Sequence, residues 1–470
     1  MLFVAVIFTA LAVSYGWGMR GCVIGGEKGA LVPGALLGLC LAYFMCDGEY
    51  SHLYMFFAAV GALSVFYGGT ETYGQTLGFV VHPDRDGYKN KVHIGLMGVF
   101  LKGGLWFAIA SGMLSLLIGT LSGEYYSPLE CSILFLLIPV CTLIGPKIFN
   151  SPYDKKNGVF PKIYFSLDRA EEWGGNVLIT LGIIILSAVK KDLLTLGAVG
   201  TGFLFGGVGF AVGLILFRIC NYGTKTRHFF KKLNEMHMIE GWKLMEHVFG
   251  AVAGGGVMLY FGLCSDKIST MLSKADVSSL PLSGDKDIFG GVAVLSMLFL
   301  SSLLYVIRAY NEKKGRIYDD RTYEMLERPL WSAFPLILIF MGSETAAAAS
   351  AFVTICYALC EKCGMEWFKG RKNEKAMRTL CAIVFILSFS YFVCCMVTDR
   401  KIPPVNLTVL YTIVYTLPCI PHFFTKEKGI ERKEKKTGIL RFYNGGGLVI
   451  FNFLVQSIII TLFVCLYFQN

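Results

Sequence analysis

Long apolar runs limit the folds open to this sequence more than any other feature. Mostly apolar stretches of about 18 residues or more recur along the chain, and a helix of that length crosses the hydrocarbon core of a bilayer. A β-barrel would instead need alternating segments of about ten residues, which the sequence lacks. We therefore expect an all-α fold, a polytopic transmembrane helical bundle of about 12–14 helices. The candidate spans cover residues 2–19, 29–46, 53–80, 93–119, 131–149, 173–189, 194–217, 241–263, 288–307, 329–360, 379–397, 404–424 and 443–467.

Composition and charge fit this fold class. Only 16% of the residues are charged, against about a quarter in soluble domains, although the formal net charge is +10. Lys and Arg cluster in short loops, as in membrane proteins, and no nucleic-acid-binding motif accompanies them. We therefore expect the lipid bilayer as a partner and no nucleic acid. The 15 cysteines lie mostly in apolar runs, and "CEKC" (360–363) has no second pair at metal spacing, so no metal site is expected.

The positions of Lys and Arg predict a topology that contains one conflict. The loops 46–52 and 121–130 contain neither residue and should lie outside, which also places the N-terminus outside. The basic loops should be cytoplasmic, yet an odd number of candidate spans separates two of them. Span 329–360 would form a helix of about 48 Å, longer than the core of about 30 Å, so we predict that it is broken or doubled around residues 341–346. The expected cytoplasmic loops are 82–92, 218–243, 361–378 and 425–441.

Two pairs of short strings raise the question of an internal repeat. "GTET" (69–72) resembles "GSET" (342–345), and "WGGNVLI" (173–179) resembles "NGGGLVI" (444–450). A single integral membrane domain, 1–470, is expected, with repeat halves 1–200 and 273–470 around helices in 201–272. Repeat-built halves are common in transporters, but glycine-rich helices also match by chance, and both interpretations remain open.

The 53 glycines allow two interpretations as well. Many are four residues apart, as are Gly34 and Gly38, and small residues at this spacing let helices approach closely. The glycines of 21–29 instead indicate unwinding, because about 1 kcal/mol per glycine is lost in a continuous helix relative to alanine. We therefore predict that 18–32 is a broken or re-entrant turn packed against the bundle.

Charged residues near the apolar spans are the candidates for a substrate or ion site, because ionisable groups at membrane depth are costly. Arg20 and Glu27 are seven residues apart, and Trp17 is placed to stack on Arg20. Lys102 is placed to pair with Glu71 or Glu27, or to extend its ammonium group to the interface. An ordinary interfacial position is the alternative for each. The full set is Arg20, Glu27, Lys28, Glu71, Gln75, Lys102, Glu246, His247 and Glu344.

Enzyme signatures are sparse. The sequence has no nucleophile elbow, no metalloprotease motif and no phosphate-binding loop, so no cofactor is expected. One enzymatic alternative remains, a membrane-embedded transferase or hydrolase for a lipid-linked substrate. Glu246, His247, Asp168 and Glu171 would form its interfacial acid/base site. A non-catalytic scaffold or channel is the third class.

Five short strings resemble a family of uncharacterised, glycine-rich, multi-pass proteins of the bacterial inner membrane. They are "GWGMRG" (16–21), "PGALLG" (33–38), "YGQTLG" (73–78), "KGGLW" (102–106) and "WKLMEHVFG" (242–250). The resemblance covers about the first 260 residues, implies a bacterial inner-membrane location, and supplies no activity. From charge placement we expect a secondary-type transporter of a small polar or anionic solute, coupled to an ion or proton gradient.

Overall fold

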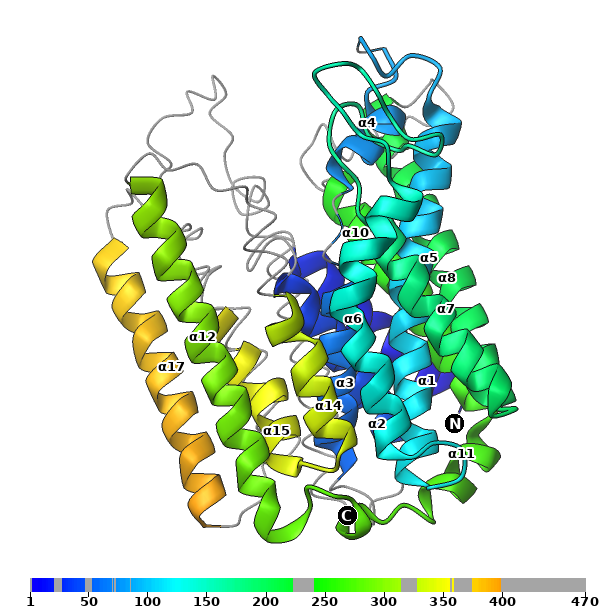
Figure 1. The fold of residues 1–470 in the computed structure, drawn as a ribbon. Coiled ribbons are helices and arrows are strands. Elements are labelled where there is room, and N and C mark those ends of the chain that lie inside the picture. The colour runs from blue at the N-terminus through cyan, green and yellow to red at the C-terminus, as the bar shows by residue number, and fades with distance from the viewer. Residues whose placement is uncertain are drawn as a thin grey trace, which may run out of the picture.

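The structure, a computed structural model, forms an all-α bundle. It describes residues 2–20, 28–46, 53–69, 71, 73–84, 86–222, 241–313, 328–355, 357–358 and 374–398. Those residues contain 14 α-helices and no β-strand, which confirms the predicted fold class (Figure 1). Six helical segments among them are long and apolar enough to cross a bilayer, so the chain is a multi-pass membrane protein.

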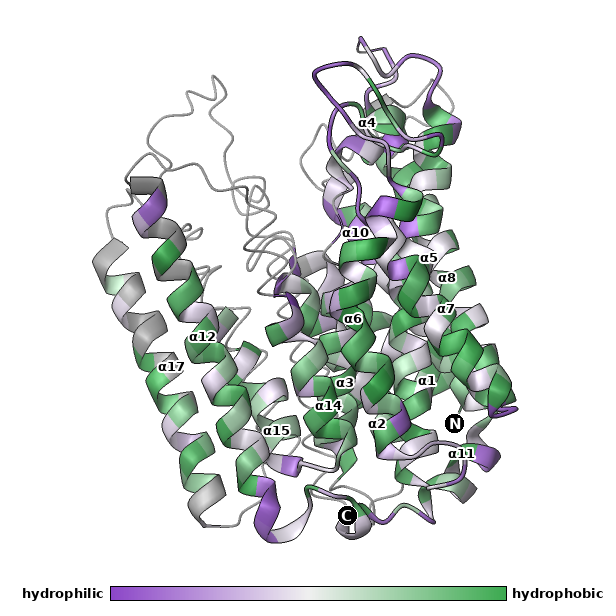
Figure 2. Cartoon of the chain, in the orientation of Figure 1, coloured by the Kyte–Doolittle hydropathy of each residue, from purple (hydrophilic) through white to green (hydrophobic). Residues whose placement is uncertain are grey.

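The core of the bundle surrounds α5 (Val92–Leu121), the hydrophobic window of which is completely buried. Helix α5 packs against α8 and α3, α1 packs against α10 and α2, and α2 packs against α3. Buried apolar side chains of these helices form one large core. Figure 2 shows that hydrophobic residues predominate along these helices. The other bounds are α1 (Leu2–Arg20), α2 (Leu31–Met45), α3 (Tyr54–Gly68), α8 (Leu193–Tyr222) and α10 (Gly241–Leu263).

The remaining helices surround this core or close its ends. Helix α6 packs on α7 and α14, α12 packs on α15, and α4 packs on α5 at one end of the bundle (Figure 1). Their bounds are α4 (Gly74–Val81), α6 (Pro128–Phe149), α7 (Trp173–Val189), α11 (Ser265–Leu272), α12 (Asp287–Lys313), α14 (Ala333–Phe340), α15 (Glu344–Ala348) and α17 (Glu374–Val397). Short helical turns are η1 (Lys28–Ala30), η4 (Val277–Ser279), η5 (Gly284–Lys286) and η6 (Ala349–Val353), a π-helical turn.

Glycine pairs set the closest helix contacts, as the four-residue spacing predicts. A Cβ added at Gly38 would lie 1.9 Å from the carbonyl oxygen of Phe57, and one added at Gly34 would lie 2.2 Å from that of Gly61. The backbones of α2 and α3 therefore touch directly, which only glycine allows at these positions.

The prediction that residues 53–80 form one helix is wrong. Helix α3 ends at Gly68 and α4 begins at Gly74, so Glu71 lies in a break between them. Gly68 packs against the backbone of Trp106, and Gly69 packs against Ala30, so both glycines sit in contacts that leave no room for a side chain. By contrast, the predicted spans 173–189 and 241–263 coincide with α7 and α10.

The prediction that span 329–360 is broken is confirmed. Helix α14 ends at Phe340, Gly342 adopts a φ of +96°, and α15 begins at Glu344 with Ser343 as its N-cap. Figure 1 shows α14 and α15 side by side, and both pack on α3, so the chain reverses at this turn. The candidate spans 404–424 and 443–467 and the basic loop 425–441 lie outside the described residues, and the internal repeat stays a prediction.

Candidate functional site

Eight charged side chains gather at one level of the bundle, where several helices begin or end. Seven of them are 8% exposed or less, and the side chain of Glu172 is 21% exposed. Four are basic residues and four are acidic residues, so their formal charges cancel when all eight are ionised. We call this set the charged layer: Arg20, Glu71, Lys102, Glu171, Glu172, Lys243, Glu246 and Arg328.

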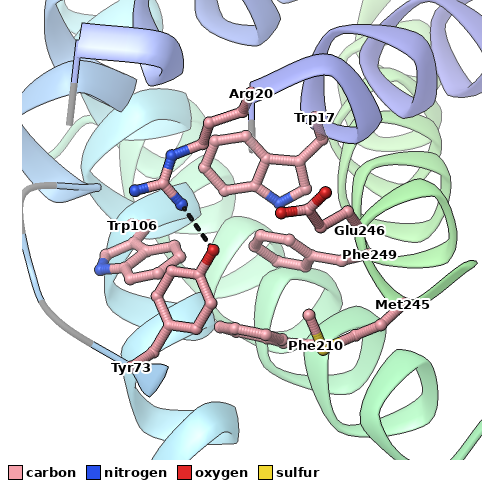
Figure 3. A pocket seen from close by; sticks show the side chains of 8 residues that line it. All are labelled: Trp17, Arg20, Tyr73, Trp106, Phe210, Met245, Glu246 and Phe249. Atoms are coloured by element: carbon pink, nitrogen blue, oxygen red, sulfur yellow. Dashed lines mark hydrogen bonds between the residues drawn. The ribbon is translucent and has the colours of Figure 1, made fainter. Parts of the chain in front are cut away.

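Arg20, the last residue of α1, sits in a box of aromatic rings (Figure 3). Its guanidinium carbon is 4.9 Å from the centroid of Trp17, 5.3 Å from that of Tyr73 and 5.7 Å from that of Trp106. Nη2 donates to the carbonyl of Gly69 at 2.8 Å, and Nη1 donates to the hydroxyl of Tyr73 at 3.3 Å. The predicted stacking of Trp17 on Arg20 is therefore confirmed, and the faces of these rings stabilise the cation.

The aromatic box is closed in this structure. Its side chains come from α1, α5, α8, α10 and the α3–α4 break, and they leave no space that a water molecule could enter. Glu246 lies at one edge of the box, so a carboxylate and a guanidinium face the same small volume (Figure 3). The lining residues are Trp17, Arg20, Tyr73, Trp106, Phe210, Met245, Glu246 and Phe249.

Glu71 is connected to the aromatic box through Trp106. Its Oε2 accepts a hydrogen bond from Nε1 of Trp106 at 3.0 Å. The other oxygen, Oε1, is buried and has no hydrogen-bond partner among the described residues. Glu71 is 4% exposed, so this oxygen has lost its water without gaining a donor in return.

Lys102 pairs with Glu171, which the sequence indicated only as part of the enzymatic alternative. Its Nζ is 3.1 Å from Oε1 of Glu171 and 3.3 Å from the hydroxyl of Thr76. The expected pair with Glu71 is therefore wrong, and the other expected partner, Glu27, lies outside the described residues. Glu171 also accepts hydrogen bonds from the backbone of Phe165 at 3.0 Å and from Nε1 of Trp173 at 3.3 Å. A buried ion pair needs such extra donors to offset its lost hydration.

Glu246 and His247 face different neighbours, as successive residues of a helix do. Glu246 accepts from Lys243 at 2.6 Å and from Nε1 of Trp242 at 2.9 Å, which ties it to the start of α10. Nδ1 of His247 lies 3.2 Å from the hydroxyl of Ser14 in α1. The two side chains therefore do not form a joint acid/base site.

Gln75 fastens a surface loop to α4. Its side-chain oxygen accepts from the backbone amides of Leu167 and Asp168 at 3.0 and 3.2 Å, and its nitrogen donates to the Asp168 carboxylate at 2.6 Å. The Lys155 ammonium, 2.6 Å from Asp168, and this Gln75 amide hold the pKa of that carboxyl below its usual 3.8. Gln75 is thereby engaged with the loop, outside the charged layer.

The remaining candidates are spread over the molecule. Nζ of Lys28 lies 4.5 Å from the ring centroid of Trp331, next to the charged layer, and Glu27 lies outside the described residues. Glu344 begins α15, beyond the end of the helical segment Arg328–Phe340. Thirteen residues at about 1.5 Å each place it about 20 Å from the level of Arg328. Glu344 is therefore not part of the charged layer.

Glu172, Lys243 and Arg328 also belong to the layer, although no motif in the sequence distinguishes them. Nη2 of Arg328 lies 2.7 Å from Oε2 of Glu172, a contact between segments 156 residues apart (328 − 172). One signal was present, because each residue directly precedes or opens an apolar span. Charges flanking spans were interpreted as interfacial, and only the tertiary contacts reveal that these ones are buried together.

The chain belongs to the class of multi-pass helical membrane proteins, with a charge-balanced layer buried inside the bundle. Comparisons with protein families, with curated proteins and with solved structures return no match for it. The resemblance to uncharacterised bacterial inner-membrane proteins stays a prediction.

Proposed function

We propose that this chain is a secondary-type transporter of a small polar or anionic solute in a bacterial inner membrane, driven by an ion or proton gradient. One observation carries the proposal, the burial of Arg20 in the closed aromatic box beside Glu246. A buried guanidinium between aromatic rings suits a solute carboxylate or phosphate, which could displace the neutral contacts to Tyr73 and Gly69.

Interrupted helices support the same function. Helix α3 stops at Gly68, next to the box, and α14 and α15 meet at Gly342 toward the other end. Transporters place substrates at such interruptions, because freed backbone groups supply ligands there and the broken segments can move. Here Gly69 at the first interruption already provides its carbonyl to Arg20.

The two rival classes receive less support from the geometry. An acid/base enzyme needs Asp168, Glu171, Glu246 and His247 to converge, but each has a separate set of partners. A passive scaffold gives no reason to bury a charged layer, which is costly unless it serves a function.

The proposed orientation in the membrane follows from the distribution of Lys and Arg along the chain. The ends of α8 and α10 next to the basic segment 218–243, and the start of α5 after 82–92, lie at the same end of the bundle (Figure 1). We take this end as cytoplasmic, which puts the charged layer nearer to the cytoplasm than to the outside.

Uptake from a complex mixture tests the function before the solute has been identified. Proteoliposomes with an inward proton gradient are incubated with a bacterial metabolite extract, washed, and their contents measured by mass spectrometry. We expect a small anionic solute to accumulate with the wild type and not with Arg20→Gln. Arg169→Gln, at an exposed arginine of the 150–172 loop, is the matched control and should transport normally. Equal contents in wild-type, Arg20→Gln and protein-free vesicles would contradict the proposal.

A further inference from the structure

The geometry points to Glu71 as a proton-binding residue of the charged layer, protonated while Lys102 is paired with Glu171. This inference names the coupling ion and therefore rests on the proposed function, but it is tested without transport.

The two oxygens of the Glu71 carboxyl group are bonded unequally. One oxygen accepts the Trp106 indole N–H at 3.0 Å, and the other is buried with no partner among the described residues. An ionised carboxylate has acceptor sites on both oxygens and stabilises itself with two or three donors. A group with a single neutral donor on one oxygen is better suited to the uncharged acid, which has less hydration to lose.

Lys102, a cation close to Glu71, is held by other residues. Lys102 and Trp106 are four residues apart and thus lie on the same face of α5, the face that contacts Glu71. The ammonium group is directed to Glu171 and Thr76 instead, at 3.1 and 3.3 Å. Glu171 holds it with the help of three more donors, from Phe165, Ser166 and Trp173. Lys102 is thus held by Glu171, and the Glu71 carboxyl group lies nearby.

Several charged groups from different elements surround Glu71. Lys102 on α5 and Glu171 and Glu172 before α7 act on it electrostatically, with the two carboxylates opposing its ionisation. Arg328 is neutralised by Glu172 at 2.7 Å, and Arg20 is turned to Gly69 and Tyr73. No described cation therefore donates a hydrogen bond to Glu71 in this arrangement.

A metal cation is a poorer occupant than a proton. Hard cations such as Ca²⁺ take six or more oxygen ligands. The carbonyl oxygens of Gly68 and Gly69 beside Glu71 already accept from Asn176 at 3.1 Å and from Arg20 at 2.8 Å. Among the residues that the structure describes, no group of three His, Cys, Asp or Glu side chains is close enough to hold a metal ion.

The proton that Glu71 releases carries the charge of the step. When the O–H bond of Glu71 breaks, the proton leaves to water on one side of the membrane and the carboxylate becomes negative. Lys102 then moves toward Glu71, and Glu171 keeps the hydrogen bonds from Phe165, Ser166 and Trp173. The moving ammonium group pulls on Thr76 and the segment before α7, which links the proton to the arrangement of the helices.

Infrared spectroscopy of the purified protein in lipid nanodiscs tests the inference directly. The protonated carboxyl C=O band is followed from about pH 5 to about pH 9, a range in which exposed carboxylates are already ionised. We expect a band at neutral pH that disappears on alkalinisation and is absent in Glu71→Gln. Glu130→Gln, at a carboxylate paired with Lys190 at the other end of the bundle, should leave it unchanged.

Glu171→Gln separates a proton site from a merely buried acid. The substitution releases Lys102, so the Glu71 band should disappear at a pH lower than in the wild type, by about one unit or more. A wild-type spectrum identical to that of Glu71→Gln over this range would overturn the inference, and so would a band that Glu171→Gln leaves in place. If the band behaves as expected but uptake fails, the proton site stands and the transport proposal falls.

Discussion

Replacing Gly38 by alanine tests the packing that positions the charged layer. Its Cβ would lie 1.9 Å from the carbonyl oxygen of Phe57, against an ordinary contact of 3.4 Å or more, so α2 and α3 have to separate by about 1.5 Å at this point. Inserting a carbon into a tight contact reduces the free energy of unfolding by about 1–3 kcal/mol. We expect the upper end of this range, because the backbone of Phe57 can move away only if the helix moves with it. Alanine returns about 1 kcal/mol of helix propensity, which leaves a net loss of about 2 kcal/mol.

The assay is reversible unfolding of the purified protein in mixed micelles, with Gly200→Ala as the control. Gly200 is an exposed glycine of α8, and an added Cβ there meets nothing within 4 Å. This control should be neutral or gain up to about 1 kcal/mol, so the two variants should differ by about 2–3 kcal/mol. Equal unfolding free energies for Gly38→Ala and Gly200→Ala would refute the direct α2–α3 contact.

Two further predictions concern the polar contacts. Lys102→Met leaves the Glu171 carboxylate buried without its cation and should reduce the free energy of unfolding by about 3–5 kcal/mol. Adding Glu171→Gln should recover part of that loss, and a double variant less stable than the single one would contradict the pairing. Gln75→Ala should speed hydrogen exchange at the amides of Leu167 and Asp168. Because the pKa of Asp168 lies below 3.8 in the folded state, the loop attachment is complete above that pH and weakens as the pH falls through the lowered value. Unchanged exchange in Gln75→Ala would exclude the attachment.

Helix positions follow closely from the sequence, because apolar length and bilayer thickness together determine them. Residues 173–189 and 241–263 form the predicted helices, and the excess length of 329–360 correctly indicated its break. The break at 69–73 was missed for the same reason. Span 53–80 is mostly apolar although it contains Glu71 and Gln75. Its interruption depends on how Gly68 fits against Trp106, which lies 38 residues further on (106 − 68).

The charged layer was only partly predictable. The cost of ionisable groups near apolar spans indicates Arg20, Glu71, Lys102 and Glu246 whatever their partners are, and Glu171 was indicated only as part of the enzymatic alternative. The partners of these charged residues could not be predicted in the same way. Glu344 matches Glu71 in its local sequence yet lies at another level, and Lys102 reaches Glu171 across 69 residues. Sequence separation carries no information on such contacts, so the partners had to come from the structure.

Access to the aromatic box from both sides of the membrane tests the central claim most directly. Met245, which lines the box and is 1% exposed, is replaced by cysteine in a variant without the 15 native cysteines. Sealed vesicles with one protein orientation are treated with a membrane-impermeant thiol reagent added either outside or inside. A transporter exposes its site to each side in turn, so the account predicts labelling from both sides, slowed by the solute identified in the uptake experiment. Labelling from one side only, or from neither, would contradict it.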